Sequence, residues 1–131
     1  MKLKVLFRDS GGMAEAEQLE IIRTSRINLS TTAACDAGAE PSWGLPERCY
    51  GVPACGGFLL CDRRRHAVED FADDERAEYG DLEDCALKIS HFLQRYDQAR
   101  GIAERARARV ARDHGYRNRA VRLLDFARHA G

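Results

Sequence analysis

The sequence predicts an α/β domain with one parallel sheet, helices on both faces of that sheet, and a helical C-terminal region. Two observations carry this prediction. Short β-prone segments alternate with helical segments up to residue 79, as in chains that build parallel sheets. Residues 58–61 are apolar throughout, as expected of a strand that is buried on both faces. The length of 131 residues fits one domain, which we place at residues 1–131.

The first three elements are a strand, a helix and a second strand. Residues 2–7 alternate apolar and polar side chains, which favours a strand. Residues 14–26 carry their glutamates in the first half, where the helix dipole favours acidic side chains. Residues 27–30 form a short β-prone run, and the small and polar residues 31–42 predict a loop.

The middle of the chain predicts a short helix, the buried strand and another short helix. Pro46 suits the first helical turn, because its missing N–H would be unpaired there in any case. Gly56 and Gly57 suit the end of that helix. The buried strand follows at once, and residues 63–71 predict the next short helix.

The C-terminal region begins with a short edge strand at residues 77–79 and continues as three helices. Asp81 suits the N-cap of the first helix, with Asp84 three residues further on. Residues 97–114 and 116–129 predict the second and third helices. The side chains expected to face inward are Leu82, Cys85, Ala86, Ile89, Phe92, Leu93 and Tyr96, then Ile102, Ala106 and Val110, then Tyr116, Ala120, Leu123, Leu124 and Ala127.

Charge is balanced overall but uneven along the chain. The 21 basic and 21 acidic residues exclude a generic polyanion binder, which would need a net positive charge. Residues 61–99 carry 11 acidic and 6 basic side chains, whereas residues 100–131 carry 9 basic and 3 acidic ones. The arginine-rich face of residues 105–122 allows peripheral contact with an anionic membrane or an acceptor. An ordinary exposed helix face is the favoured alternative.

The cysteines and the hydropathy pattern predict a cytoplasmic protein. The five cysteines contain no CxxC pair, and together with the four histidines they lack the ligand spacing that zinc requires. We therefore expect reduced thiols, no metal and no cofactor. No run of about 18 apolar residues predicts a transmembrane helix, and the apolar start is too short for a signal peptide.

A ligand site is expected at the carboxyl ends of the strands, where open parallel sheets bind their ligands. The turn Trp43-Gly44-Leu45 opens into a helix start, whose free N–H groups can hold a phosphate. Arg48 can add a bidentate contact to the same anion. An ordinary loop with Trp43 packed against the sheet is the favoured alternative. For Trp43 itself two interpretations stay open: stacking on a base or sugar, or capping the core.

The run Arg63-Arg64-Arg65-His66 has two interpretations. It could bind a phosphate or a nucleic acid, or it could be a run of solvated charges with no ligand. The acidic residues that follow it neutralise its charge and favour the solvated interpretation. They are Glu69, Asp70, Asp73 and Asp74.

Several segments resemble one family of glycosyltransferases. Gly44-Leu45-Pro46-Glu47-Arg48, followed by residues 53–62, is similar to the C-terminal part of the CgeB-like (spore-maturation, YkvP-type) glycosyltransferases. These are relatives of the group 1 glycosyltransferases and have a GT-B fold. The resemblance covers about residues 15–130. The other segments that carry it are Ile22–Ser30, Asp81-Leu82-Glu83, Ile102–Ala106 and His114–Arg119.

This resemblance implies that the chain is the donor-binding, Rossmann-like half of a GT-B enzyme. Such enzymes move a sugar from a nucleoside diphosphate to an acceptor hydroxyl without a bound metal, and helix N-termini and basic side chains stabilise the leaving diphosphate. The N-terminal acceptor domain would be absent, and a partner protein could supply it. No catalytic residue is assigned. The residues implied to bind or support the donor are Ser42, Trp43, Gly44, Leu45, Arg48, Gly51, Gly56, Gly57 and Asp62.

One departure from the family pattern bears on function. Where the family reads Arg-x-Phe-Glu-x-Pro-Ala-Cys-Gly, this chain has Gly51 in place of the glutamate that contacts the donor ribose in the wider superfamily. Loss of that carboxylate would weaken nucleotide binding by ~1–3 kcal/mol. A non-catalytic interaction module is therefore the alternative function. Nucleic-acid binding is a weaker third hypothesis, because the middle segment is acidic and no aromatic residues interleave the basic ones.

Overall fold

The computed structural model describes residues 14–31, 45, 47–65 and 67–130. The strand predicted at residues 2–7 lies outside the described residues, as does most of the loop predicted at residues 31–42. The elements along the chain are α1 (Glu15–Thr24), β1 (Asn28–Ser30), α2 (Arg48–Ala54), β2 (Leu59–Asp62), α3 (Ala67–Asp70), β3 (Ala77–Tyr79), α4 (Leu82–Gln94), α5 (Tyr96–Asp113) and α6 (Tyr116–Ala130).

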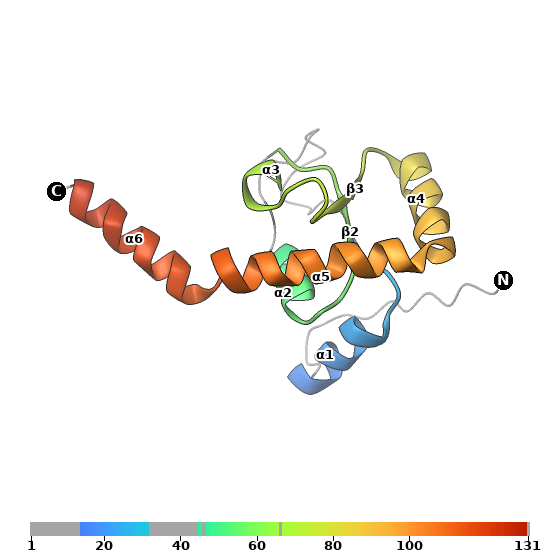
Figure 1. The fold of residues 1–131 in the computed structure, drawn as a ribbon, viewed down its shortest axis with the longest axis horizontal. Helices are drawn as coiled ribbons and strands as arrows, with labels where there is room; N and C mark the ends of the chain where they lie inside the picture. The colour runs from blue at the N-terminus through green and yellow to red at the C-terminus, as the bar shows by residue number, and fades with distance from the viewer. Residues whose placement is uncertain (1–13, 32–44, 46, 66, 131) are drawn as a thin grey trace.

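The described strands form a parallel sheet in the order β1-β2-β3, which confirms the predicted α/β class (Figure 1). Leu60 of β2 pairs with Leu29 on one side and with Ala77 on the other. Leu60 is completely buried, as the unbroken apolar run predicts for a central strand. In this sheet β3 is an edge strand, also as predicted.

Helices cover both faces of the sheet. Successive side chains of a strand point to opposite faces, so Leu60 and Cys61 face different helices. Leu60 belongs to a buried cluster with Cys85 and Phe92 of α4, whereas the thiol of Cys61 meets that of Cys49 in α2. This arrangement leaves the carboxyl ends of the strands between α2 and the start of α4.

The long helix α5 packs against the rest of the domain along a stripe of small residues. Ala99 and Ala103 join the cluster around Leu60, while Ala106 and Val110 pack with Phe71 in a second cluster. The spacing of three and four residues keeps these four side chains on one face of the helix. The inward positions predicted for Ala106 and Val110 are therefore confirmed.

Two helix ends form as their sequences predict. The carboxylate of Asp81 accepts a hydrogen bond of 2.8 Å from the N–H of Asp84, so Asp81 is the N-cap of α4. At the end of α2, the N–H groups of Gly56 and Gly57 donate to the carbonyls of Pro53 and Val52 at 2.9 and 3.0 Å. Gly56 has φ of +82°, the left-handed conformation that such a helix end requires.

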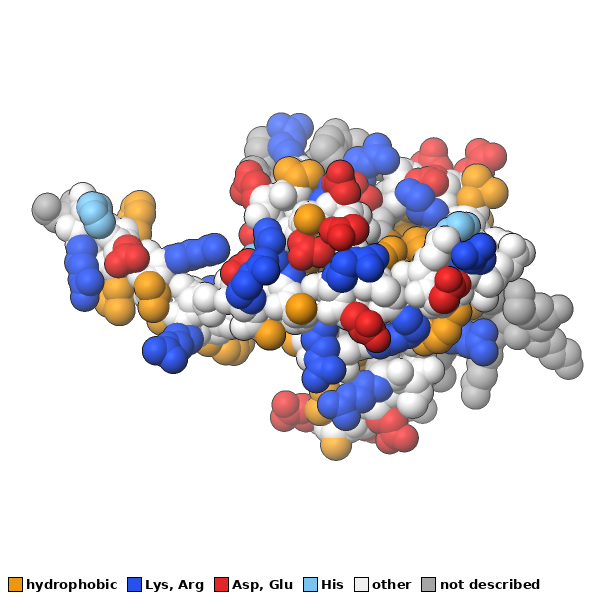
Figure 2. Space-filling view, viewed as in Figure 1, with side chains coloured by type: hydrophobic (Ala, Val, Ile, Leu, Met, Phe, Trp, Pro, Cys, Tyr) orange, Lys and Arg blue, Asp and Glu red, His pale blue; other side chains and the backbone are white. Residues whose placement is uncertain are grey.

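The predicted inward faces are wrong in two places. Leu82 and Ala86 of α4 are exposed, because the part of α4 that meets the buried cluster begins with Cys85. In α6 all five predicted inward residues are exposed, since this helix extends away from the body of the domain (Figures 1 and 2). Helical periodicity identifies the apolar face of a helix, but it does not show whether another element packs against that face.

Candidate functional site

Two arginines meet at the carboxyl edge of the sheet. Arg48 lies in the first turn of α2, and its Nη2 is 3.5 Å from the carbonyl oxygen of Thr31, just after β1. Arg64 follows β2, and its Nη2 donates to the same carbonyl at 3.3 Å. Both guanidinium groups therefore converge on one backbone oxygen, at the edge where open parallel sheets hold their ligands.

Asp62, the last residue of β2, holds Arg64 in place. Its Oδ1 accepts hydrogen bonds from Nη2 and Nε of Arg64 at 3.2 and 3.3 Å. The two side chains are only 9% and 2% exposed, so this is a buried ion pair. Burial opposes the charge of Arg64, but the Asp62 carboxylate and the Cys61 thiol together outweigh it and raise the pKa of Arg64. Arg48 is exposed, which makes it the cation of this group that a ligand can reach.

Ser30 ends β1 beneath the two arginines. Its side chain is fully buried, and its hydroxyl has no hydrogen-bond partner within the part of the chain that the structure describes. Its carbonyl oxygen accepts a hydrogen bond of 2.8 Å from the hydroxyl of Tyr79. A buried hydroxyl without a partner costs stability, so the end of β1 retains unused hydrogen-bonding capacity.

A pair of buried thiols lies below the arginines. The Sγ atoms of Cys49 and Cys61 are 3.6 Å apart, and the Cys61 thiol lies 3.4 Å from Oδ1 of Asp62. The hydrogen bond from Cys61 lowers the pKa of Cys49 against the effect of burial, with help from Arg64 and Arg48. The same contact raises the pKa of Cys61. The prediction of free, mostly buried thiols is confirmed for Cys49, Cys61 and Cys85, and Cys55 is free and half-buried.

The structure brings together two of the predicted site residues, Arg48 and Asp62. Leu45 instead packs against the cluster of Phe71, Ala106 and Val110. Gly51 lies three residues after Arg48 in α2, with open space where a side chain would begin. Ser42, Trp43 and Gly44 lie outside the described residues.

Gly56 and Gly57 lie at the opposite end of α2 from Arg48, where they permit close packing. A Cβ atom on Gly57 would lie 2.7 Å from Cγ2 of Ile22 and 3.0 Å from both Nδ2 of Asn28 and Cγ1 of Val52. Only a residue without a side chain lets α1, β1 and α2 approach so closely. A direct role of these two glycines in ligand binding stays a prediction.

Sequence reasoning missed the special position of Arg64. Its neighbours Arg63 and Arg65 are exposed, but Arg64 is 4% exposed, so the interpretation of the run as solvated is wrong for Arg64. The signal that could have found it is its place two residues after Asp62, because a buried strand that ends in a carboxylate needs a cation close by.

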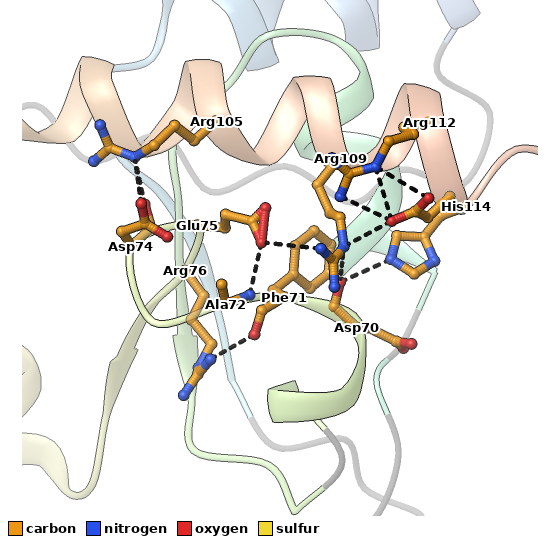
Figure 3. Close-up of polar contacts among 11 residues, drawn as sticks. Asp70, Phe71, Ala72, Asp74, Glu75, Arg76, Arg105, Arg109, Arg112 and His114 are labelled. Carbon is orange, nitrogen blue, oxygen red and sulfur yellow. Dashed lines mark hydrogen bonds and ion pairs between the residues drawn. The ribbon is translucent and has the colours of Figure 1, made fainter.

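Sequence reasoning also missed how α5 binds the loop between α3 and β3 (Figure 3). Arg105 donates to the carbonyl of Asp74 at 2.8 Å, and Arg109 donates to that of Asp70 at 3.1 Å and pairs with Glu75 at 3.6 Å. His114, at the end of α5, contacts the same Asp70 carbonyl at 2.8 Å. The acidic middle of the sequence therefore meets the basic helix within the chain.

The cavity beneath the site is too small for a substrate. It lies between the sheet, α2 and α5, is mostly apolar, and has a volume of about 40 Å³. This is room for a few water molecules at most, far below the several hundred Å³ of a typical ligand pocket. A larger ligand therefore does not fit inside this cavity, and at the carboxyl edge it would meet the exposed Arg48 on the outside of the domain.

Comparison with known families agrees with this architecture. The described strands and helices form a parallel α/β domain in which two arginines converge at the carboxyl ends of the strands. A family model described as glycosyl transferase-like matches residues 6–125. The chain therefore belongs to the glycosyl transferase-like family. A search of curated proteins and a search of solved structures each returned no match.

Proposed function

We propose that this chain is the donor-binding part of a glycosyltransferase of the CgeB-like type, and that Arg48 binds the diphosphate of a nucleotide sugar. The observation that carries the proposal is the convergence of Arg48 and Arg64 on the carbonyl of Thr31. With Asp62 included, this group of three charged side chains has a net charge of +1. Membership of the glycosyl transferase-like family supplies the reaction class.

The exposed guanidinium of Arg48 suits the chemistry of this reaction. When the bond between the sugar and the nucleoside diphosphate breaks, negative charge grows on the leaving diphosphate. A guanidinium can donate two parallel hydrogen bonds to phosphate oxygens and so stabilises that charge. Arg64 acts as a positioning residue, because its bonds to Asp62 and Thr31 fix the edge against which Arg48 lies.

The acceptor side of the reaction needs residues that we do not assign in this chain. We propose that a second domain supplies the acceptor hydroxyl and the base that takes its proton. We also propose that the protein acts in the cytoplasm. Gly51 has no side chain and therefore no carboxylate for the ribose hydroxyls, so we expect weaker ribose binding than in relatives with glutamate at this position.

Isothermal titration calorimetry of the chain with UDP, GDP, ADP and inorganic pyrophosphate tests the proposal. We expect saturable binding of at least one nucleoside diphosphate, weakened about 10- to 100-fold by Arg48→Ala, because charged hydrogen bonds contribute about 1.5–3 kcal/mol. Arg95→Ala is the matched control, since Arg95 is exposed at the C-terminal end of α4 and pairs with Asp97. An absence of heat with every nucleotide would leave the non-catalytic interaction module as the better function.

A further inference from the structure

Helix α6 exposes an apolar face that the rest of the described structure does not cover. Side chains 119–129 are all exposed, and α6 extends away from the body of the domain (Figures 1 and 2). Phe126 is 73% exposed and Leu123 is 68% exposed. Soluble monomers rarely leave several large apolar side chains uncovered on one element, so this face marks an interaction surface.

The apolar and basic residues of α6 are ordered around the helix. At about 100° per residue, the side chains of Tyr116, Ala120, Leu123, Leu124, Phe126 and Ala127 fall on one side. Arg119 lies within this side, between Phe126 and Leu123, and Val121 lies outside it. Arg117 and Arg128 border this side along one edge, and Arg122 lies beyond the other. Asp125 falls on the opposite side. An apolar face with arginines along its borders is typical of a helix that lies in the surface of a membrane.

The arginines of α6 differ from those of α5 in their partners. In α5, Arg105 and Arg109 pair with Asp74 and Glu75 of the neighbouring loop. Helix α6 contains four arginines and one aspartate, so its net charge is +3 with histidine neutral. Arg119 stacks on the ring of Tyr50 with its Cζ 4.7 Å from the ring centre, and so anchors the first turn of α6 to the body.

We propose that α6 binds an anionic membrane surface. The helix lies parallel to the membrane, with Leu123, Leu124 and Phe126 at the boundary of the acyl chains. Arg117, Arg122 and Arg128 contact the lipid phosphates. Its 15 residues give a length of about 22 Å, and no described helix is long and apolar enough to cross a bilayer. This inference rests on α6 alone and is independent of the proposed nucleotide site.

Charge complementarity favours a lipid surface over a second copy of this chain. If the apolar faces of two α6 helices packed together, the arginines along their borders would lie close to one another and repel. An anionic bilayer offers apolar depth and negative charge at the same surface. It therefore satisfies both the apolar face and its basic borders.

Vesicle flotation of the intact chain tests this proposal. We expect binding to vesicles of phosphatidylcholine with 30% phosphatidylglycerol, and little binding to phosphatidylcholine alone. The double variant Arg122→Gln/Arg128→Gln should lower the partition coefficient roughly 25-fold at low salt, at about fivefold for each arginine. Leu124→Gln/Phe126→Gln should lower it at least tenfold. Matched controls are Leu87→Gln on α4 and Arg95→Gln between α4 and α5, which should leave binding unchanged.

The folded state and the oligomeric state are measured on the same samples. Circular dichroism should show unchanged helix content in every variant, because the substituted side chains of α6 are exposed. Failure of the intact chain to float with anionic vesicles overturns the proposal, as does flotation that the α6 variants leave unchanged. A dimer in sedimentation velocity that Leu124→Gln/Phe126→Gln abolishes, without vesicle binding, assigns this face to a second copy instead.

Discussion

The hydroxyl of Tyr79 donates a hydrogen bond of 2.8 Å to the carbonyl oxygen of Ser30 and so joins β3 to β1 across the central strand. Both residues are buried. The next carbonyl along the chain, that of Thr31, is the one that Arg48 and Arg64 approach. The bond therefore fixes the end of β1 at the place where the candidate site is built.

Removing this hydroxyl should destabilise the domain. Tyr79→Phe leaves the buried carbonyl of Ser30 without its donor, and we expect the free energy of unfolding to fall by about 1–2 kcal/mol. Urea unfolding followed by circular dichroism measures the change. Tyr116→Phe is the control, because Tyr116 is 85% exposed and its substitution should change stability by less than about 0.5 kcal/mol. Equal effects of the two substitutions would contradict this assignment.

Stability should also fall at alkaline pH. Burial, with the charge of Asp62 nearby, raises the pKa of Tyr79 to about 12 from the ordinary value of 10. Burial and the hydrogen bond to Asp70 raise the pKa of Tyr50 as well. A raised pKa in the folded state means that the neutral phenol stabilises the fold. That contribution is complete below pH 10 and is lost as the pH rises through the folded pKa.

Unfolding in urea between pH 9 and 12, with tyrosinate absorbance read in parallel, measures this dependence. Stability should decline above pH 10, and Tyr79→Phe should make the decline shallower. A Tyr79→Phe variant with the same pH profile as the parent chain would show that another group controls the alkaline transition.

The buried pair of Asp62 and Arg64 should show strong coupling. Arg64→Met removes the guanidinium that pairs with the buried Asp62 carboxylate, and we expect a loss of about 3–5 kcal/mol. Adding Asp62→Asn in the same chain should cost much less than the sum of the two single changes, because the buried carboxylate that Arg64 neutralises is then gone. A double-mutant cycle from urea unfolding gives the coupling energy. Additive effects would mean that the two side chains do not act as a pair.

Local sequence patterns predicted the elements better than the contacts between them. The Asp81 cap, the glycine end of α2 and the buried strand β2 each depend on a few adjacent residues, and all three are confirmed. Arg64 was misread because the Thr31 carbonyl it contacts lies 33 residues earlier in the chain. Arg105 likewise reaches Asp74 over 31 residues. Such partners become visible only when the strands and helices are placed in space.

The tight packing at Gly57 gives a prediction with a matched control. A methyl group there would meet Ile22, Asn28 and Val52 at 2.7–3.0 Å, so Gly57→Ala should cost about 1–3 kcal/mol of stability. Gly51→Ala, in open space within α2, should instead stabilise by about 0.5–1 kcal/mol, since glycine is a poor residue inside a helix. Thermal unfolding measured by calorimetry compares the two. A destabilised Gly51→Ala or a neutral Gly57→Ala would contradict the packing described for α2.

Introducing a carboxylate at position 51 should tighten nucleotide binding at the proposed site. Residue 51 lies three positions after Arg48, so a side chain there shares the face of α2 from which Arg48 reaches the carboxyl edge of the sheet. The surrounding space admits it without a clash. Because a carboxylate can accept hydrogen bonds from ribose hydroxyls, Gly51→Glu should strengthen binding of a nucleoside diphosphate by ~1–3 kcal/mol.

Calorimetry with a nucleoside diphosphate and with inorganic pyrophosphate separates this effect from a change in the helix. Pyrophosphate has no ribose, so Gly51→Glu should not tighten its binding, and the added negative charge next to Arg48 should weaken it slightly. Gly51→Ala shares the gain in helix propensity but lacks the carboxylate, and it should leave both affinities near those of the parent chain. If Gly51→Glu weakened nucleotide and pyrophosphate equally, the carboxylate would be acting only through its charge, and the ribose would not lie beside α2.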